Sequence, residues 1–330
     1  MPERPDLPEL LAGAVPFALP LEREFRGLRL REGVLIHGPS GWGEFAPFDD
    51  YSDVAASRWL DSAIEAAYGQ WPDPVRAEVP VNAILPAVPP DVAAELTRHA
   101  VIDSGCSTIK VKVGSAELAD DEARVAAVRQ VLSDLLGPGR GTIRIDANGA
   151  WDVPRGQRAL ACLAQFGLEY VEQPCRTREE MAELRSRVDV RFAVDELIRQ
   201  SDAPVTSVRD FADVAVLKPA TLGGVTATLR IAERLDVPVV VSGSLDSSVG
   251  LAVSIAAAAA LPDLPDACGL GTGALLADDL GDRVLPTAGA LTAGRVPPDE
   301  AALERARARV DAQRVEHWHQ RLAAAWAVKG

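Results

Sequence analysis

Short runs of β-branched residues alternate with longer stretches rich in alanine, leucine and arginine from about Val79 onward. Each run ends in polar residues, and the stretch that follows is long enough for one helix and its loops. The runs cover residues 79–86, 108–114, 142–149, 170–174, 191–196, 214–219, 237–243 and 267–273. Strands that alternate with helices favour a parallel sheet. Eight of them in succession predict an α/β fold, closed as a (β/α)8-type barrel.

The chain before and after these runs has a different pattern. Residues 27–38 and 41–48 alternate like antiparallel strands, and residues 57–71 have the periodicity of an amphipathic helix. The end of the chain is predicted to hold one charged helix, over residues 301–326, that returns to pack on the first part. We therefore predict an α+β domain over residues 1–78, a barrel over residues 79–285 and a helical tail over residues 286–330.

Composition supports a folded protein and excludes several classes of function. The 330 residues are 48% hydrophobic with a mean hydropathy of +0.04, which excludes a disordered chain. With 34 basic and 48 acidic residues the net charge is −14, so we expect no binding to nucleic acid or to an anionic membrane. Four widely spaced cysteines are predicted to be free thiols of a reducing compartment. We find neither a signal peptide nor a membrane span, and we expect a cytoplasmic protein.

Three acidic residues stand at the ends of three consecutive predicted strands. They are Asp146, Glu172 and Asp195, and each follows the previous one by about one strand–helix unit. Catalytic groups of such barrels cluster at the carboxyl ends of the strands. A single acid there could be a helix cap, but three inward carboxylates cannot all stay ionised without a cation. Hard oxygen ligands suit Mg²⁺, with Mn²⁺ as an alternative, so we predict a metal site.

Basic residues flank this set of acids. Lys110 and Lys112 share one face of the second strand, Arg144 shares the face of Asp146, and Lys218 ends the sixth strand. A lysine close to other cations has a lowered pKa and can act as a base. We expect Lys110 and Arg144 to be those cations. The alternative is that a lysine forms an ion pair with a ligand carboxylate, and the two roles can coexist.

Further polar or glycine-rich positions at the strand ends are candidates for contacts with the substrate or with the ligands. The segment 269–273 lacks the glycine spacing of a dinucleotide loop, and an anion-binding turn is the better interpretation. The segment 242–244 could donate backbone N–H groups to a carboxylate, or it could be a plain turn. The candidate residues are Asn148, Glu196, Ser242, Gly243, Ser244, Gly271 and Thr272.

Five short motifs together resemble the enolase superfamily, in its muconate lactonising enzyme subgroup. In chain order they are KVK (110–112), DAN (146–148), EQP (172–174), DE (195–196) and LKP (217–219). The resemblance covers nearly the whole chain, including GWGEFAPF (41–48). It implies a modified (β/α)7β barrel with an N-terminal capping domain that the C-terminal tail completes. It also implies that Asp146, Glu172 and Asp195 hold Mg²⁺, and that Lys112 and Lys218 are the acid/base pair. The shared chemistry is removal of a proton α to a carboxylate, which gives an enediolate.

Within the subgroup, several features are most like the o-succinylbenzoate synthases. The chain is short, Arg144 precedes the first ligand, and GLGTG stands where a dipeptide epimerase has an acidic motif. The resemblance implies syn-dehydration of 2-succinyl-6-hydroxy-2,4-cyclohexadiene-1-carboxylate to 2-succinylbenzoate in menaquinone biosynthesis. Lys112 would move both protons, and Lys218 would stabilise the anion. An N-acylamino acid racemase, a dipeptide epimerase and a metal-binding barrel without catalysis remain alternatives. We expect a small-molecule carboxylate as substrate and a monomer or small homo-oligomer.

Overall fold

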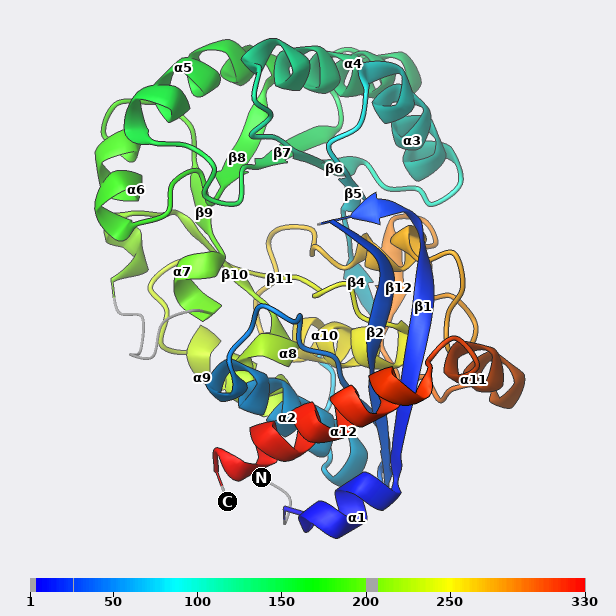
Figure 1. Ribbon diagram of the computed structural model, residues 1–330. Coiled ribbons are helices and arrows are strands. Elements are labelled where there is room, and N and C mark those ends of the chain that lie inside the picture. The colour runs from blue at the N-terminus through cyan, green and yellow to red at the C-terminus, as the bar shows by residue number, and fades with distance from the viewer. Residues whose placement is uncertain (1–3, 26, 200–206, 330) are drawn as a thin grey trace.

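The barrel is built on a curved parallel sheet of seven strands in the described part of the chain, with the order β11-β10-β9-β8-β7-β6-β5 (Figure 1). The computed structural model describes residues 4–25, 27–199 and 207–329. The strands are β5 (Ala83–Leu85), β6 (Thr108–Lys112), β7 (Thr142–Asp146), β8 (Leu168–Glu172), β9 (Phe192–Val194), β10 (Val214–Leu217) and β11 (Val239–Val241). Their side chains are mostly buried, because helices cover the outer face of the sheet and side chains fill its interior.

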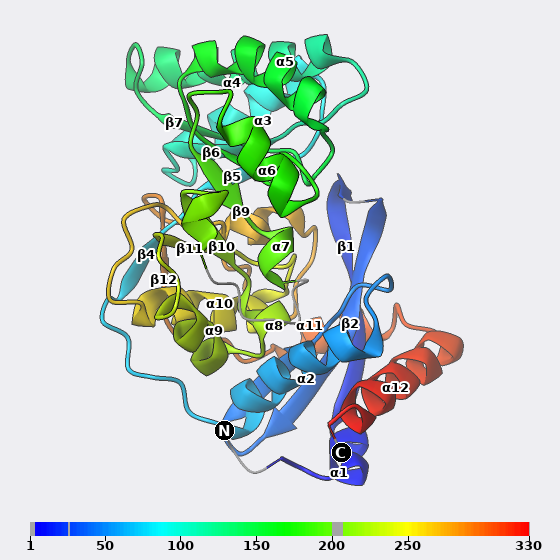
Figure 2. The same ribbon diagram turned by 90° about the vertical axis from the view of Figure 1, so that its left-hand side faces the viewer.

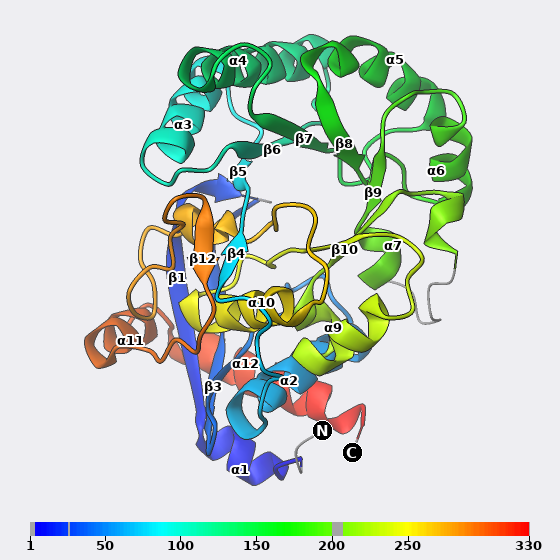
Figure 3. The ribbon, with the colours of Figure 1, turned by 180° about the vertical axis from the view of Figure 1, so that it is seen from behind.

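The first and last predicted strands differ from expectation. Residues 79–86 form two strands, β4 (Glu78–Pro80) and β5, and β4 pairs antiparallel with β12 (Ala290–Thr292) from the tail (Figure 3). The run 267–273 forms no full strand: single bridges join Val81 to Cys268 and Ser242 to Gly269, and the 3-10 helix η3 (Gly271–Leu275) follows. A Cβ on Gly269 would lie 2.6 Å from the Ser242 Oγ. The barrel therefore closes by close backbone approach at glycine, not by an eighth β-branched strand.

Helices connect the strands on the outside of the barrel. They are α3 (Pro90–Ile102), α4 (Leu118–Leu136), α5 (Val153–Leu163), α6 (Arg178–Arg185), α9 (Val225–Ala232) and α10 (Ser248–Ala260). Two single turns, α7 (Glu196–Arg199) and α8 (Pro219–Leu222), follow the ends of β9 and β10. Every residue of α10 is buried, because the barrel lies on one side of it and the capping domain on the other. This explains why α10 is apolar on all faces.

The first part of the chain forms the predicted α+β unit. Its sheet has the order β1-β2-β3, with β1 (Ala14–Phe25), β2 (Leu28–Gly38) and β3 (Gly41–Phe45) antiparallel. The short helix α1 (Leu7–Ala12) precedes the sheet, and α2 (Asp53–Tyr68) packs on it. The predicted strands and helix are confirmed, although α2 begins earlier than predicted, after the N-cap Ser52. We call this unit the capping domain.

The tail contains two helices where the pattern predicted one. They are α11 (Glu300–Arg307) and α12 (Ala312–Ala327), and the break lies at Asp311, whose carboxylate accepts a hydrogen bond from the Arg314 N–H. That N-cap starts a new helix in a new direction. Helix α11 packs on β1, and α12 packs along α2 and α1 (Figure 2). The last part of the chain therefore contacts the first. Among the described residues, no helix has the length and apolar character needed to cross a membrane.

Candidate active site

The three predicted acids lie together at the carboxyl ends of neighbouring strands. Asp146 ends β7 and Glu172 ends β8 in direct register, while Asp195 follows β9 immediately. Each of the three residues is only 1% exposed. The structure thus brings three carboxylates to one mouth of the barrel, beneath the capping domain.

Each carboxylate has an ammonium group beside it. The Lys112 Nζ lies 2.6 Å from the Asp146 Oδ2, and the Lys218 Nζ lies 2.5 Å from the Asp195 Oδ2. The Lys110 Nζ lies 2.9 Å from both oxygens of Glu172. In this arrangement, with an ammonium group on each carboxylate, no three His, Cys, Asp or Glu side chains among the described residues are grouped so as to hold a metal ion. The ion pairs left open as an alternative for the lysines are therefore present.

Burial and charge act differently on the three acids. Burial raises the pKa of Glu172 to about 7, and Asp146 acts in the same direction. Burial would also raise the pKa of Asp146, but Lys112 and Lys110 outweigh it and hold that pKa below its usual range. For Asp195, burial is likewise outweighed by Lys218 and Arg199, so its pKa is lowered. The acids repel one another, and surrounding cations offset the repulsion.

The pKa values of the two lysines of β6 are also shifted in opposite directions. Burial lowers the pKa of Lys112, and the neighbouring Lys110 adds to this, although Asp146 opposes it. Burial acts on Lys110 as well, but Glu172 and Asp146 outweigh it and raise its pKa. The pKa of Lys112 is thus lowered, as expected, but burial is the main cause and the expected cation Lys110 a smaller one. Of the two lysines, only Lys112 has its pKa shifted in the direction that favours the uncharged amine.

Among the described residues, the hydrogen bonds of Arg144 go to groups other than Lys112, and its predicted effect on the pKa of that lysine stays a prediction. Its guanidinium donates to the Asn82 Oδ1 at 3.0 Å, to the Ala267 carbonyl at 2.5 Å and to Glu169. Arg144 does share a face with Asp146, but it lies two residues earlier, about 6–7 Å lower along the strand. Arg144 thus connects β7 to Glu169, Asn82 and Ala267 by hydrogen bonds. Lys110, in register with Arg144 on β6, does reach the carboxylates at the mouth, so strand alternation predicts the face of a residue but not the direction in which a long side chain extends.

Asn148 and Glu196 belong to a chain of hydrogen bonds around the mouth. The Lys112 Nζ donates to the Asn148 Oδ1 at 2.7 Å, and the Asn148 Nδ2 donates to the Glu196 Oε1 at 3.2 Å. Arg199 donates to the same Glu196 oxygen and also to Asp195. Sequence reasoning missed Arg199. The available signal was its place one helical turn after Asp195.

The cavity at the mouth is small, and the capping domain closes it. Its volume is about 40 Å³, against about 470 Å³ for a second cavity elsewhere in the molecule. Side chains of Phe25, Phe48 and Tyr51 line it from the capping domain. The barrel contributes both lysines of β6, Lys218, Arg199, Asp146, Asn148, the segment 242–245 and Thr272 among others. The capping domain and the barrel therefore line one narrow site together.

The prediction that the amides of residues 242–244 bind a carboxylate is wrong for this structure. The Ser242 N–H donates to the Leu217 carbonyl, the Gly243 N–H to the Gly269 carbonyl, and the Ser244 N–H to Asp246. Two hydroxyls nearby are unengaged: among the described residues, the buried Ser244 Oγ and Thr272 Oγ1 have no hydrogen-bond partner. Both residues line the cavity.

Gly271, also predicted to contact the substrate, does not line this cavity. It packs on the backbone of β5, where a Cβ would lie 2.5 Å from the Asn82 carbonyl oxygen. Close packing explains this glycine better than anion binding does.

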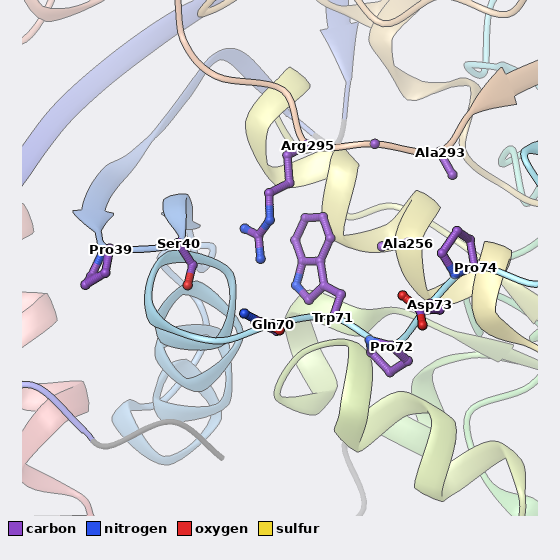
Figure 4. A pocket seen from close by; sticks show the side chains of 11 residues that line it. Pro39, Ser40, Gln70, Trp71, Pro72, Asp73, Pro74, Ala256, Ala293 and Arg295 are labelled. Carbon is purple, nitrogen blue, oxygen red and sulfur yellow. The ribbon is translucent and has the colours of Figure 1, made fainter.

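A larger cavity of about 470 Å³ lies elsewhere, between the end of α2, α10 and the tail (Figure 4). The Arg295 guanidinium stacks 4.0 Å from the centroid of Trp71, and it donates to the Ala66 and Gly69 carbonyls at the end of α2. None of the predicted site residues lines this cavity. The hydrogen bonds of Arg295 go to the end of α2, so the cavity lies where parts of the fold pack together.

Comparison with known proteins agrees with this geometry. Family models described as "Enolase N-terminal domain-like" and "Enolase C-terminal domain-like" match residues 16–67 and 92–301. The chain is 51% identical to the o-succinylbenzoate synthase of Thermobifida fusca, across 94% of this chain and 95% of the relative. It is 48% identical to that of Mycobacterium ulcerans, across 97% and 95%.

The fold is also found among solved structures. The muconate lactonizing enzyme from Pseudomonas fluorescens, complexed with muconolactone, superposes with a TM-score of 0.73 at 22% identity, covering 89% of this chain and 97% of that one. At this identity the likeness shows the fold alone. The family follows from the models and the close relatives: the chain belongs to the enolase superfamily and, within it, to the o-succinylbenzoate synthases.

Proposed function

We propose that the chain catalyses the syn-dehydration of 2-succinyl-6-hydroxy-2,4-cyclohexadiene-1-carboxylate to 2-succinylbenzoate, a step of menaquinone biosynthesis. The observation that carries the proposal is the placement of two lysines around the acids. Lys112 on β6 and Lys218 after β10 are separated in the sheet by β7, β8 and β9, which carry the carboxylates. A substrate held between them is flanked by an ammonium group on each side. Relatives named o-succinylbenzoate synthase share about half of the residues.

Mg²⁺ suits the donor set, and Asp146, Glu172 and Asp195 would hold it, with Mn²⁺ as an alternative. The donors are buried carboxylates on adjacent strands, and burial, followed by repulsion from Asp146, raises the pKa of Glu172. A divalent cation would relieve both effects. When bound, the cation supplies positive charge that stabilises the enediolate. The lysine ammonium groups already contact the same carboxylate oxygens, so cation and ammonium compete for them.

Lys112 is proposed as the base and then the acid. Its uncharged amine takes the proton from the carbon α to the carboxylate, which leaves an enediolate. As the C–O bond to the departing hydroxyl breaks, the same ammonium returns the proton, and water leaves from the same face. Asp146 and Asn148 fix the position of the Lys112 nitrogen. Lys218, on the other face, stabilises the anion and contacts the ring as it becomes aromatic.

The carboxylate of the substrate needs donors that no protein group occupies. The free hydroxyls of Ser244 and Thr272 meet this requirement, because they line the cavity and are buried without a partner among the described residues. A buried donor without a partner is costly, and a bound carboxylate removes that cost. We therefore infer that these two hydroxyls orient the substrate.

The test of the function is an ultraviolet assay that follows formation of the aromatic product in the presence of Mg²⁺. We expect dehydration by the parent protein and little deuterium exchange into an N-succinylamino acid. The same pair of lysines could exchange protons on opposite faces of an amino acid, so the exchange assay distinguishes a racemase from a synthase. Efficient racemisation with negligible dehydration would contradict the proposal.

Removal of a ligand tests the metal site. We expect Glu172→Gln to weaken Mg²⁺ binding, measured by calorimetry, and to abolish most of the turnover, because one of three charged donors is lost. Glu169→Gln is the matched control: it lies on the same strand but contacts Arg144 below the mouth. Full activity of the parent in excess chelator would rule the metal out.

The location and assembly of the protein also remain proposals. All four cysteines are free, and Cys106, Cys175 and Cys268 are buried. Burial raises the pKa of these three thiols, which makes them poor nucleophiles. Unpaired structural thiols are typical of a reducing compartment, and we infer the cytoplasm. A monomer or small homo-oligomer is expected, and size-exclusion chromatography with light scattering tests it.

A further inference from the structure

Arg199 joins the barrel to the capping domain at the mouth of the site. Its guanidinium is buried and donates in three directions: Nε to the Asp195 Oδ1 at 3.2 Å, Nη2 to the Glu196 Oε1 at 2.9 Å, and Nη1 to the hydroxyl of Tyr51. Asp195 and Glu196 belong to the barrel, whereas Tyr51 belongs to the capping domain. The Arg199 guanidinium therefore contacts both a carboxylate of the site and the capping domain above it.

The capping side of this contact is held firmly. Arg321 of α12 donates to the carbonyls of Phe48 and Tyr51 at 2.7 and 2.8 Å, and the Tyr51 ring meets Trp59 edge-on with centroids 6.1 Å apart. In addition, Arg58 of α2 donates to the backbone carbonyl of Arg199 at 3.1 Å. The capping domain thus contacts both the backbone and the side chain of Arg199.

The barrel side of the contact leads to both lysines. Asp195 accepts from Arg199 through one oxygen and from Lys218 through the other. Glu196 accepts from Arg199 and from Asn148, which in turn accepts from the Lys112 ammonium. A displacement of the Arg199 guanidinium therefore changes the surroundings of both lysines.

We propose that Arg199 is a positioning residue: it orients Asp195 and, through it, Lys218, and it holds this arrangement while Tyr51 closes the mouth. The proposal rests on the proposed function. Arg199 acts through the residues it binds, so it is not assigned a step of the chemistry. Closure of the capping domain and alignment of the site are in this way a single event.

Two substitutions test the contacts of Arg199 with the barrel and with Tyr51 separately. Arg199→Lys keeps the charge, but one ammonium group cannot reproduce a planar fork with three partners. Tyr51→Phe keeps the ring against Trp59 and removes only the hydroxyl. Arg185→Lys is the matched control, because Arg185 of α6 forms a two-pronged ion pair with Asp213 away from the mouth. A purely structural loss at either arginine would lower the melting temperature alone.

The experiment measures kcat and KM for dehydration, and Mg²⁺ affinity by calorimetry without substrate. We expect Arg199→Lys to lower kcat and Mg²⁺ affinity by about 10- to 100-fold, the usual effect of losing a partner of a metal ligand. Tyr51→Phe should lower kcat less. The double variant should be no worse than Arg199→Lys, because both changes break one link. Arg185→Lys should stay within about twofold of the parent, as expected for a partly exposed pair.

The outcomes distinguish this proposal from the proposed function. If the parent dehydrates its substrate but Arg199→Lys matches the control, the positioning role fails and the function stands. Additive losses in the double variant would overturn the coupling between Arg199 and Tyr51. If the parent does not dehydrate but Arg199→Lys still weakens Mg²⁺ binding, the function fails and the positioning role stands.

Discussion

At the residue scale, Lys112 and Lys110 stand on the same face of one strand and differ in their neighbours. Burial lowers the pKa of Lys112, while two carboxylates raise that of Lys110. We therefore predict that Lys112→Ala loses at least the 10²–10⁴-fold in kcat typical of a general acid–base group. Circular dichroism and calorimetry should show an unchanged fold and bound Mg²⁺. A kcat within about tenfold of the parent would remove Lys112 from the mechanism.

Substitutions of Lys218 show whether this residue supplies only a positive charge or also transfers a proton. In the dehydration one lysine serves both proton transfers, so Lys218 needs only to present a positive charge. Arginine supplies that charge but does not readily release a proton. We predict that Lys218→Arg retains more dehydration activity than Lys218→Ala, measured as kcat for each variant. Equal loss in both variants, together with racemase activity in the parent, would instead indicate a second proton-transferring group.

At the scale of the elements, a carboxylate of the capping domain binds the N-cap residue of a barrel helix. Glu44 of β3 accepts hydrogen bonds from the N–H and hydroxyl of Ser247 at the start of α10. Burial raises the pKa of Glu44 to about 7, and the nearby Asp246 acts in the same direction. The folded state therefore retains a proton that the unfolded chain loses above about pH 4.5, and this lowers stability as the pH rises from about 4.5 to 7.

Glu44→Gln removes this dependence. We predict that the free energy of unfolding falls less between pH 5 and pH 8 in Glu44→Gln than in the parent, by about 2–3 kcal/mol at most, at about 1.4 kcal/mol per pKa unit. Urea unfolding at both pH values measures it, and the exposed Glu304→Gln is the control. Identical pH profiles of parent and variant would show that Glu44 is ionised throughout.

At the scale of the whole molecule, the C-terminal helix α12 packs on the capping domain and helps to form it. Trp318 of α12 is buried and meets Phe45 of β3 edge-on, with centroids 6.2 Å apart. We predict that Trp318→Ala lowers the free energy of unfolding by about 3–5 kcal/mol, as for other buried aromatic residues. KM should rise as well, because the same helix carries Arg321. The exposed Gln320→Ala should change neither quantity, and an equal loss in that control would indicate general fraying of α12.

Much of this arrangement follows from local sequence, and the rest depends on tertiary contacts. The strands from β6 to β11 are runs of β-branched residues, and the acids at their ends are visible in the spacing. The closing segment around Gly269 was misread as a strand because its glycines serve close packing. Strand alternation gives the face of Arg144, but the direction in which its side chain extends depends on its partners Glu169, Asn82 and Ala267. Arg199 and Tyr51 meet only when the two domains are assembled, so no local pattern predicts their contact.

The contacts between α12 and the capping domain have a consequence for folding during synthesis. The sheet β1–β3 is local and needs few residues to form, and the parallel strands can add one after another. The barrel closes only when Cys268 reaches Val81, and the turn that carries Tyr51 is held by Arg321, near the other end of the chain. A growing polypeptide on the ribosome therefore contains Asp146, Glu172 and Asp195 long before it can complete the site. Activity should appear last, as a property of the finished chain.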